Sequence, residues 1–248
     1  MQPTFNKKLL ILFGVTLSCV VFFYYYQNSW IDSSEIISKN NGNSTFFNTQ
    51  TTSKIKPVFN QNLNAEIALI GNIETGHIFY EKSSDTEALI ASITKLLSAT
   101  VVLSKMDLDS VVTINQSIYN KLPSKNDLVL NEQIKVYDLL RMALVMSSND
   151  AISALAYHYG YDGFVEVMNQ KALEIGMFHS HFSNAVGFDS DQNYSSALDL
   201  FYLSRYIYNN HAIIGEISKS KAFNFKSVSG VKHLVIPTNT IIDQIPEF

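Results

Sequence analysis

Apolar positions alternate with polar ones early in the globular part of this chain and later change to helical spacing. Residues 65–70 and 77–81 alternate and flank a turn-rich stretch, which predicts a β-hairpin. Longer stretches with an apolar face predict helices over 92–105, 136–146, 150–159, 164–175 and 195–209. Short apolar runs predict strands over 111–114, 222–228 and 233–236. Helices inserted between sheet-forming ends indicate an α+β fold.

The N-terminal segment carries an uncharged run behind two lysines. Lys7 and Lys8 precede residues 9–26, eighteen residues without a charge, which is just long enough to span a bilayer as a helix. The lysines would stay in the cytoplasm. A cleaved signal peptide is the alternative, but no clear small-x-small cleavage site follows. We therefore expect residues 1–30 to be a membrane anchor or signal segment, with one transmembrane helix and everything later exported.

The next segment, residues 31–64, is rich in Ser, Asn and Thr and has little apolar periodicity. Such a composition predicts a flexible polar linker. The globular domain is then expected over residues 65–248.

Composition excludes several classes of function. The net charge is −4 over 248 residues, so no broad basic surface favours nucleic acid as a partner. Cys19 is the single cysteine and lies in the apolar N-terminal run, which leaves no thiol nucleophile or zinc cluster in the domain. His179 and His181 form the closest histidine pair, and no His-Glu-x-x-His helix is present. We expect neither a metal nor a cofactor.

The segment Ser92-Ile93-Thr94-Lys95 opens an apolar helix. A serine and a lysine three residues apart lie on one face, about one turn from each other, which suits a serine nucleophile activated by an amine. The spacing alone is common: Ser53/Lys56, Ser218/Lys221 and Ser229/Lys232 also have it. None of those pairs opens an apolar helix, so Ser92 and Lys95 are the candidate pair.

A second candidate element, Ser147-Ser148-Asn149, follows the helix that ends near Met146. The Ser-x-Asn pattern also occurs at Ser38/Asn40 and Ser124/Asn126. A polar turn at the end of an apolar helix can point into a cleft. The alternative is capping of the next helix by Ser148 or Asn149, with Asp150 favoured there by the helix dipole. The two interpretations are compatible.

Together these segments resemble the serine D-alanyl-D-alanine carboxypeptidases, the low-molecular-mass penicillin-binding proteins. Four ordered blocks carry the resemblance, which runs from about residue 65 to the end: the Ser92 segment, the Ser147-to-Ala151 segment, Met168 to Met177, and His181 to Asp189 followed by Asn193 to Leu200. The resemblance implies a β-lactamase/transpeptidase-like fold, an antiparallel sheet with a helical block. It also implies a location on the outer side of the bacterial cell membrane.

The resemblance also implies a role for each candidate residue. Ser92 would attack the D-Ala-D-Ala bond of a peptidoglycan stem peptide and form an acyl-enzyme, and its N–H would supply half of an oxyanion hole. Lys95 would act as base, Ser147 would relay a proton to the leaving amine, and Asn149 would bind the substrate amide. β-Lactams would acylate the same serine. A D,D-endopeptidase, a β-lactamase or a non-catalytic penicillin-binding module remain alternatives.

The family's third element, Lys-Thr-Gly, does not occur in this chain. Glu74-Thr75-Gly76 and Val228-Ser229-Gly230 come nearest, and neither carries a cation. Residues 237–243 resemble the stretch that shortly precedes Lys-Thr-Gly in the family, so we expect a chain truncated before that element. Missing C-terminal strands would leave an unpaired sheet edge. We accordingly expect this chain to be poorly stable and nearly inactive.

Overall fold

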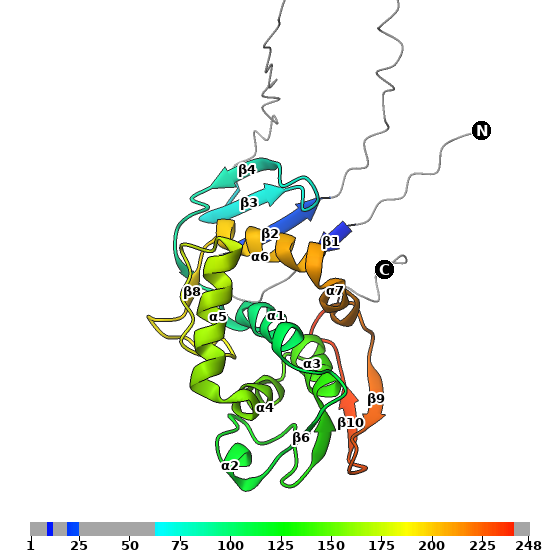
Figure 1. Cartoon of the computed structure of the whole chain (residues 1–248). Helices are drawn as coiled ribbons and strands as arrows, with labels where there is room; N and C mark the ends of the chain where they lie inside the picture. Colours follow the sequence, from blue (N-terminus) through cyan, green and yellow to red (C-terminus); the bar gives the residue numbers. More distant parts are fainter. Residues whose placement is uncertain (1–8, 12–18, 25–62, 241–248) are drawn as a thin grey trace, which may run out of the picture.

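A computed structural model describes residues 9–11, 19–24 and 63–240 of the chain. The predicted hairpin is confirmed: β3 (Ile67–Gly71) pairs antiparallel with β4 (Ile78–Lys82). Asn72 forms the turn, because its side-chain oxygen accepts the backbone N–H groups of Glu74 at 2.9 Å and Thr75 at 2.8 Å. The hairpin forms the upper layer in Figure 1, and α6 (Ala197–Asn210) runs beneath it.

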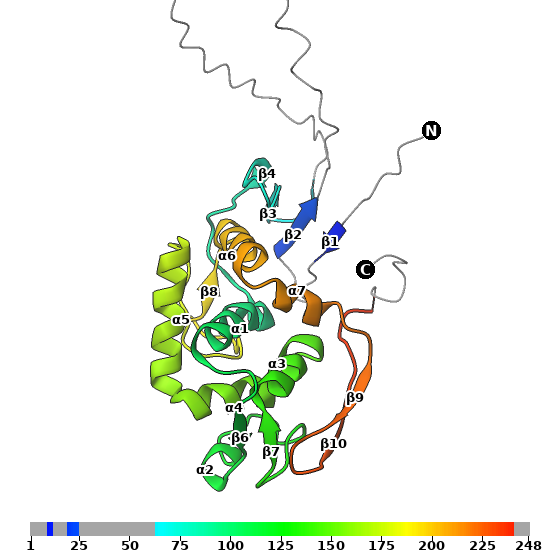
Figure 2. The same ribbon diagram turned by 45° about the vertical axis from the view of Figure 1, so that its right-hand side comes forward.

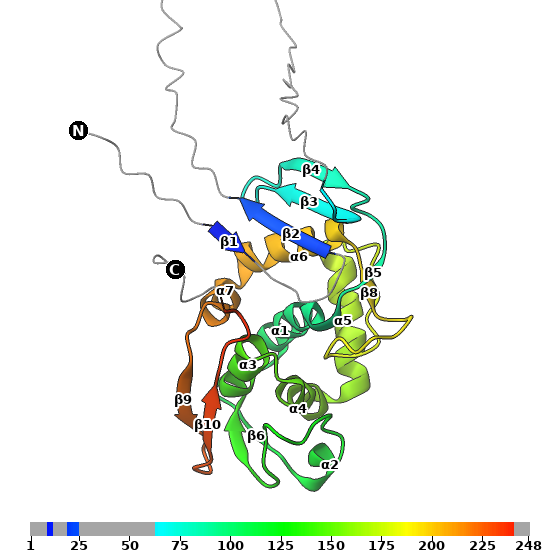
Figure 3. The same ribbon diagram turned by 180° about the vertical axis from the view of Figure 1, so that it is seen from behind.

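The described parts of the predicted transmembrane helix are strands, so a helix is not confirmed there. β1 (Leu9–Ile11) pairs antiparallel with β2 (Cys19–Tyr24), and β2 pairs parallel with β3. Figure 3 shows β2 beside β3. The run Val20 to Tyr24 is β-branched and aromatic, and these residue types favour strands when an edge is open. Residues 12–18 and 25–26 of the predicted helix lie outside the described part.

A further expectation about the sheet changes with this pairing. The order β1-β2-β3-β4 contains one parallel pair, so the sheet is not purely antiparallel. Strand β2 occupies the edge of β3 opposite β4. No helix in the described part of the chain is long and apolar enough to cross a membrane. Most of the predicted linker, residues 31–62, lies outside the described residues.

The helical block lies below the sheet, and all five predicted helices are present with small shifts at their ends. A 3₁₀ turn, η2 (Ala91–Ile93), leads into α1. The structure also contains two short helices, α2 and α7, which the apolar pattern did not predict. The helix bounds are α1 (Thr94–Lys105), α2 (Gln116–Tyr119), α3 (Val136–Val145), α4 (Asn149–Tyr159), α5 (Tyr161–Ile175) and α7 (Ala212–Ser218). Helix α1 is central: it contacts α3, α4, α5 and α6, and most of its length is buried (Figure 2).

The remaining strands form small two-stranded sheets rather than joining the large one. These are β5 (Ala88–Leu89) with β8 (Tyr194–Ser195), β6 (Val111–Thr113) with β7 (Gln133–Lys135), and β9 (Phe223–Lys226) with β10 (Lys232–Val235). The sheet-forming ends of the chain therefore do not meet in one sheet.

The β9–β10 hairpin is docked by a buried polar contact. The His233 ring hydrogen-bonds to Glu132 at 2.6 Å, and the Glu132 side chain is fully buried. The ring of Phe225 stacks on His233, and the Arg141 guanidinium lies 3.6 Å from the centre of the Phe223 ring. These contacts hold the hairpin against α3 and the β6–β7 hairpin.

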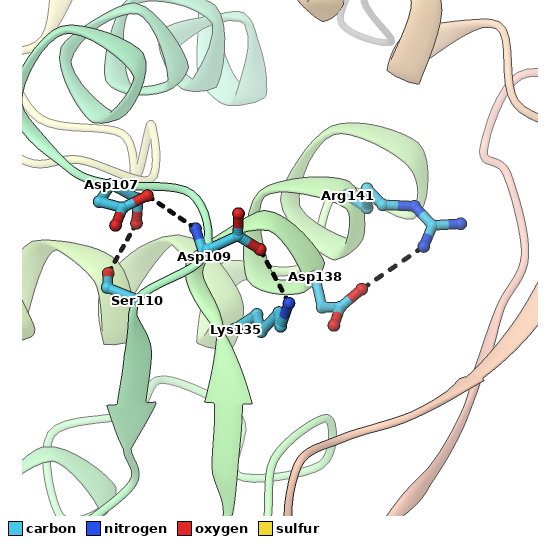
Figure 4. A network of polar contacts seen from close by, with 6 residues as sticks. All are labelled: Asp107, Asp109, Ser110, Lys135, Asp138 and Arg141. Carbon is cyan, nitrogen blue, oxygen red and sulfur yellow. Dashed lines mark hydrogen bonds and ion pairs between the residues drawn. The ribbon is translucent and has the colours of Figure 1, made fainter.

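Figure 4 shows the more exposed polar contacts where β6, β7 and α3 meet. Lys135 binds Asp109 at 2.8 Å, and Arg141 binds Asp138 at 3.4 Å within α3. Asp109 is almost fully exposed, so water screens its attraction to Lys135. These exposed contacts order the loop before β6. The buried contact between His233 and Glu132 contributes more to the stability of the region.

Candidate functional site

The structure brings Ser92 and Lys95 into direct contact. Ser92 lies in η2 and Lys95 in the first turn of α1, and the Lys95 Nζ donates a hydrogen bond to Ser92 Oγ at 2.9 Å. The serine is exposed, whereas the lysine is 2% exposed. The predicted one-turn spacing therefore yields an accessible hydroxyl with a buried amine behind it.

Burial changes the acid–base chemistry of this amine. Desolvation lowers the pKa of Lys95 from 10.5 to about 8. The second bond of Nζ goes to the Val186 carbonyl oxygen at 2.9 Å, and in the described part of the chain no carboxylate pairs with this lysine. A neutral carbonyl orients the amine without holding a proton on it as strongly as a carboxylate would. Lys95 can therefore accept the Ser92 proton near neutral pH.

The carbonyl of Val186 belongs to a tight loop, residues 184–188. One side-chain oxygen of Asn184 accepts three successive backbone N–H groups, those of Val186 at 3.2 Å, Gly187 at 2.7 Å and Phe188 at 3.0 Å. The Asn184 amide also donates to the Phe188 carbonyl at 3.1 Å. The loop is thereby closed on itself by its own hydrogen bonds.

Gly187 lets this loop touch the backbone next to Ser92. Its φ is +89°, and a Cβ there would lie 1.9 Å from the Ala91 carbonyl oxygen. Ala91 directly precedes Ser92 and itself has φ +45°, a backbone conformation that is strained for residues other than glycine. The loop and the Ser92 turn therefore fit together without room for any side chain between them.

A polar contact fastens the loop to α1: Ser98 Oγ donates to the Ala185 carbonyl at 2.8 Å. Beyond the loop, the Asn193 amide donates to Thr94 Oγ1 of α1 at 3.2 Å. Sequence reasoning did not identify Val186, Ala185 or Asn184 as site residues, because two of them act through backbone carbonyls. The available signal was that Asn184 and Gly187 both lie in the segment His181 to Asp189, one of the segments that carry the family resemblance.

The second predicted element forms the turn between α3 and α4. Ser147 has φ +58°, and the N–H of Ser148 bonds back to the Met142 carbonyl, which ends α3. Capping of α4 by Ser148 is confirmed, since its Oγ accepts the Ala151 N–H at 3.1 Å. Ser147 and Asn149 are partly exposed, and in the described residues neither side chain hydrogen-bonds to Ser92 or Lys95. Helix α4, which begins at Asn149, packs against α1.

The other sequence features lie elsewhere. Glu74-Thr75-Gly76 is in the β3–β4 turn and Val228-Ser229-Gly230 in the β9–β10 turn. Within residues 63–240, no group of three or more His, Cys, Asp or Glu side chains could hold a metal ion. His181 binds the Gln192 carbonyl, and His179 lies beside Asp199, so the pair does not converge.

Sequence comparison relates most of the chain to known peptidases. Residues 49–244 match the D-alanyl-D-alanine carboxypeptidase family. A D-alanyl-D-alanine endopeptidase of Escherichia coli is 34% identical over 62% of this chain and 50% of its own length. A D-alanyl-D-alanine carboxypeptidase of a Streptomyces species is 31% identical over 66% of this chain and 62% of its own length. The chain thus spans about half to two thirds of the length of these relatives.

Structural comparison agrees. The crystal structure of a Streptomyces DD-transpeptidase superposes with a TM-score of 0.62 at 28% identity, covering 69% of this chain and 72% of that one. A penicillin-binding protein homologue of Mycobacterium tuberculosis, 24% identical, shares the fold with a TM-score of 0.68 over 75% of this chain. The predicted α+β architecture is thereby confirmed at the level of the fold. Since the family match covers well over half of the sequence, this chain belongs to the D-alanyl-D-alanine carboxypeptidase family of peptidases.

Proposed function

We propose that this protein has the fold and site of a serine D-alanyl-D-alanine carboxypeptidase, which removes the terminal D-alanine from peptidoglycan stem peptides. Because Lys-Thr-Gly does not occur in these 248 residues, we expect their own turnover to be slow. The observation that carries the proposal is the contact between exposed Ser92 and buried Lys95, whose pKa lies at about 8. An exposed hydroxyl backed by a partly neutral amine is the arrangement required of an acylating serine. Family membership supports the choice of a D-Ala-D-Ala bond.

The reaction begins with transfer of the Ser92 proton to neutral Lys95. Ser92 Oγ then attacks the carbonyl carbon between the two D-alanines, and the backbone N–H of Ser92 stabilises the developing oxyanion. Ser147 passes a proton to the leaving amine, so free D-alanine departs and the shortened peptide remains as an ester on Ser92. Asn149 binds the substrate amide. Water hydrolyses the ester and restores the serine. A β-lactam would form the same ester by opening of its ring.

The D,D-endopeptidase reaction is a second candidate, because two relatives with that name are 34% and 38% identical to this chain. It differs only in the amine that leaves, a cross-linked peptide in place of free D-alanine. Mass spectrometry of products from defined monomeric and cross-linked stem peptides separates the two. A β-lactamase would instead release hydrolysed penicillin rapidly, and a non-catalytic module would bind without turnover.

Covalent labelling with a fluorescent penicillin tests the proposed nucleophile. Label should attach to Ser92 and disappear in Ser92→Ala. Ser218→Ala is the matched control, since Ser218 has the same spacing to Lys221 but ends α7. Labelling that persists in Ser92→Ala, or that is lost equally in Ser218→Ala, contradicts the proposed role of Ser92.

We also propose, from the sequence, that the domain acts outside the cytoplasmic membrane, where peptidoglycan lies. Lys7, Lys8 and the uncharged run of residues 9–26 support an anchor. Insertion of that run as a helix would separate residues 19–24 from β3, so the anchored form and the observed strand pairing exclude each other. Recovery of the protein from carbonate-washed membranes would support the anchor, and recovery in the wash would contradict it.

A further inference from the structure

A loop that precedes β7 lies against the start of α4. Asp150, fully buried in the first turn of α4, accepts four hydrogen bonds from this loop. Its carboxylate binds the Ser124 N–H at 2.8 Å, the Ser124 hydroxyl at 2.7 Å, the Asn126 N–H at 3.0 Å and the Asp127 N–H at 3.3 Å. The segment Ser124-Lys125-Asn126, which repeats the Ser-x-Asn pattern in the sequence, is therefore attached beside the Ser147-Ser148-Asn149 turn.

The last residue of the loop reaches that turn directly. Asp127 Oδ2 accepts a hydrogen bond from Ser148 Oγ at 2.5 Å, and the same Oγ accepts the Ala151 N–H at 3.1 Å. The Ser148 hydroxyl thus uses its proton for the loop and its lone pair for the helix cap. Its orientation is set from both sides, and it is the residue between Ser147 and Asn149.

These bonds matter because Ser147 has an unfavourable backbone. Its φ of +58° lies in the left-handed region, which disfavours every residue with a Cβ. Such a conformation persists only where the surroundings determine it. On the N-terminal side, the Ser148 N–H bonds to Met142 in α3. On the C-terminal side, the described contacts that fix the turn are those of Ser148 and Asp150 with the loop.

The network consists of neutral donors around a charge. Burial raises the pKa of Asp150, but the hydrogen bonds from Ser124 and from backbone N–H groups of the loop outweigh it and leave the pKa below the ordinary value. The carboxylate also lies at the N-terminal end of α4, where the helix dipole favours a negative charge. Asp150 is accordingly ionised at neutral pH and able to accept all four bonds.

We propose that Asp127 and Asp150 are positioning residues: they hold the Ser124–Asp127 loop on the start of α4 and thereby fix the direction of Ser147 and Asn149 toward substrate. The link to catalysis rests on the proposed function. Neither carboxylate touches the reacting atoms. Asp127 acts through the Ser148 hydroxyl, and Asp150 acts through the loop that carries Asp127.

The test compares Asp127→Ala with Asp127→Asn in the full chain. Asparagine keeps an oxygen that accepts from Ser148, so we expect Asp127→Asn to be acylated by a labelled penicillin within threefold of the wild-type rate. Asp127→Ala should be acylated at least tenfold more slowly. Asp109→Ala, which removes an exposed carboxylate from another loop, is the control and should match the wild type. Equal acylation rates in Asp127→Ala and the wild type would overturn the proposal.

Amide hydrogen exchange separates this proposal from the proposed function. The amides of Ser124 and Asn126 belong to exposed residues, and protection of them in the wild type would report their bonds to Asp150. Asp150→Ala, which removes both acceptor oxygens, should remove that protection while the amides of α5 stay protected. Asp127→Ala should speed exchange at the Ser148 amide. If the wild type is not labelled by penicillin, the proposed function fails, and unprotected loop amides or unchanged Ser148 exchange would independently overturn the positioning role.

Discussion

The contact between Gly187 and the nucleophile's turn makes a quantitative prediction. In Gly187→Ala, the new Cβ would lie 1.9 Å from the Ala91 carbonyl oxygen and 2.4 Å from its carbon. Since such contacts need about 3 Å, the loop and the Ser92 turn must separate by about 1 Å. A misplacement of about 1 Å at a reacting group can cost about 10²-fold in rate. We therefore expect acylation of Ser92 to fall by about two orders of magnitude.

Strain from the positive φ must be separated from this collision. Gly176 supplies the control: its φ is +94°, and a Cβ there meets nothing within 4 Å. An alanine at either position pays about 1–2 kcal/mol of stability for a left-handed backbone. At Gly187 the clash adds about 1–3 kcal/mol for overpacking. Gly176→Ala should thus lose some stability and keep its acylation rate.

The assay is the rate constant of covalent labelling by a fluorescent penicillin, measured with urea unfolding of each variant. Labelling is measured well below the unfolding midpoint, so that the rate refers to folded protein. Gly187→Ala acylated within threefold of Gly176→Ala, at equal loss of stability, would refute the argument. It would mean that the loop and the Ser92 turn do not touch as closely as the structure shows.

Three further predictions concern the same fold. Because burial lowers the pKa of Lys95 to about 8, about one tenth of the amine is neutral at pH 7, and the acylation rate should rise from pH 6 and level off above about pH 8. A rate that continues to rise up to pH 10 would show that Lys95 has the pKa of an ordinary lysine. Asn184→Ala removes the acceptor of three backbone N–H groups and should slow acylation at least tenfold, whereas Asn184→Asp keeps that acceptor and should slow acylation less. Equal acylation rates in the two variants would contradict the role of the loop. His233→Ala removes a buried hydrogen-bond partner of the Glu132 carboxylate and should lower the free energy of unfolding by about 1–3 kcal/mol. Lys135→Ala, at an exposed pair, should change it little, and similar losses in both variants would be contrary evidence.

The helices and the contact between Ser92 and Lys95 could be predicted because they depend on local pattern. Helix α1 has apolar residues on every side, and the Ser92–Lys95 contact needs only one helical turn, so spacing was sufficient. The apolar run of residues 9–26 was ambiguous for the opposite reason. Apolar length alone does not distinguish a helix from strands, and the open edge of β3 decided the pairing of residues 19–24.

The supporting shell of the site could not be predicted from residue types. Val186 contributes a backbone carbonyl, which every residue has, and only the fold shows that this one faces Lys95. The helix dipole alone accounted for an aspartate at position 150 in the sequence. The structure shows in addition that the Asp150 carboxylate accepts a hydrogen bond from the Ser124 hydroxyl. The repeated pattern at Ser124 and Asn126 carried no prediction, because nothing in the sequence placed it beside α4.

The hydrogen bond between Lys95 and Val186 joins residues 91 positions apart. An unfolded chain has a hydrated, protonated Lys95 and hence a Ser92 no more reactive than any other serine. The amine loses its water only when the loop of residues 184–188 closes over it, after that part of the chain has been synthesised and packed. On the proposed function, reactivity toward acyl donors is therefore acquired with the tertiary structure, because Lys95 is buried only once two distant segments of the chain have met.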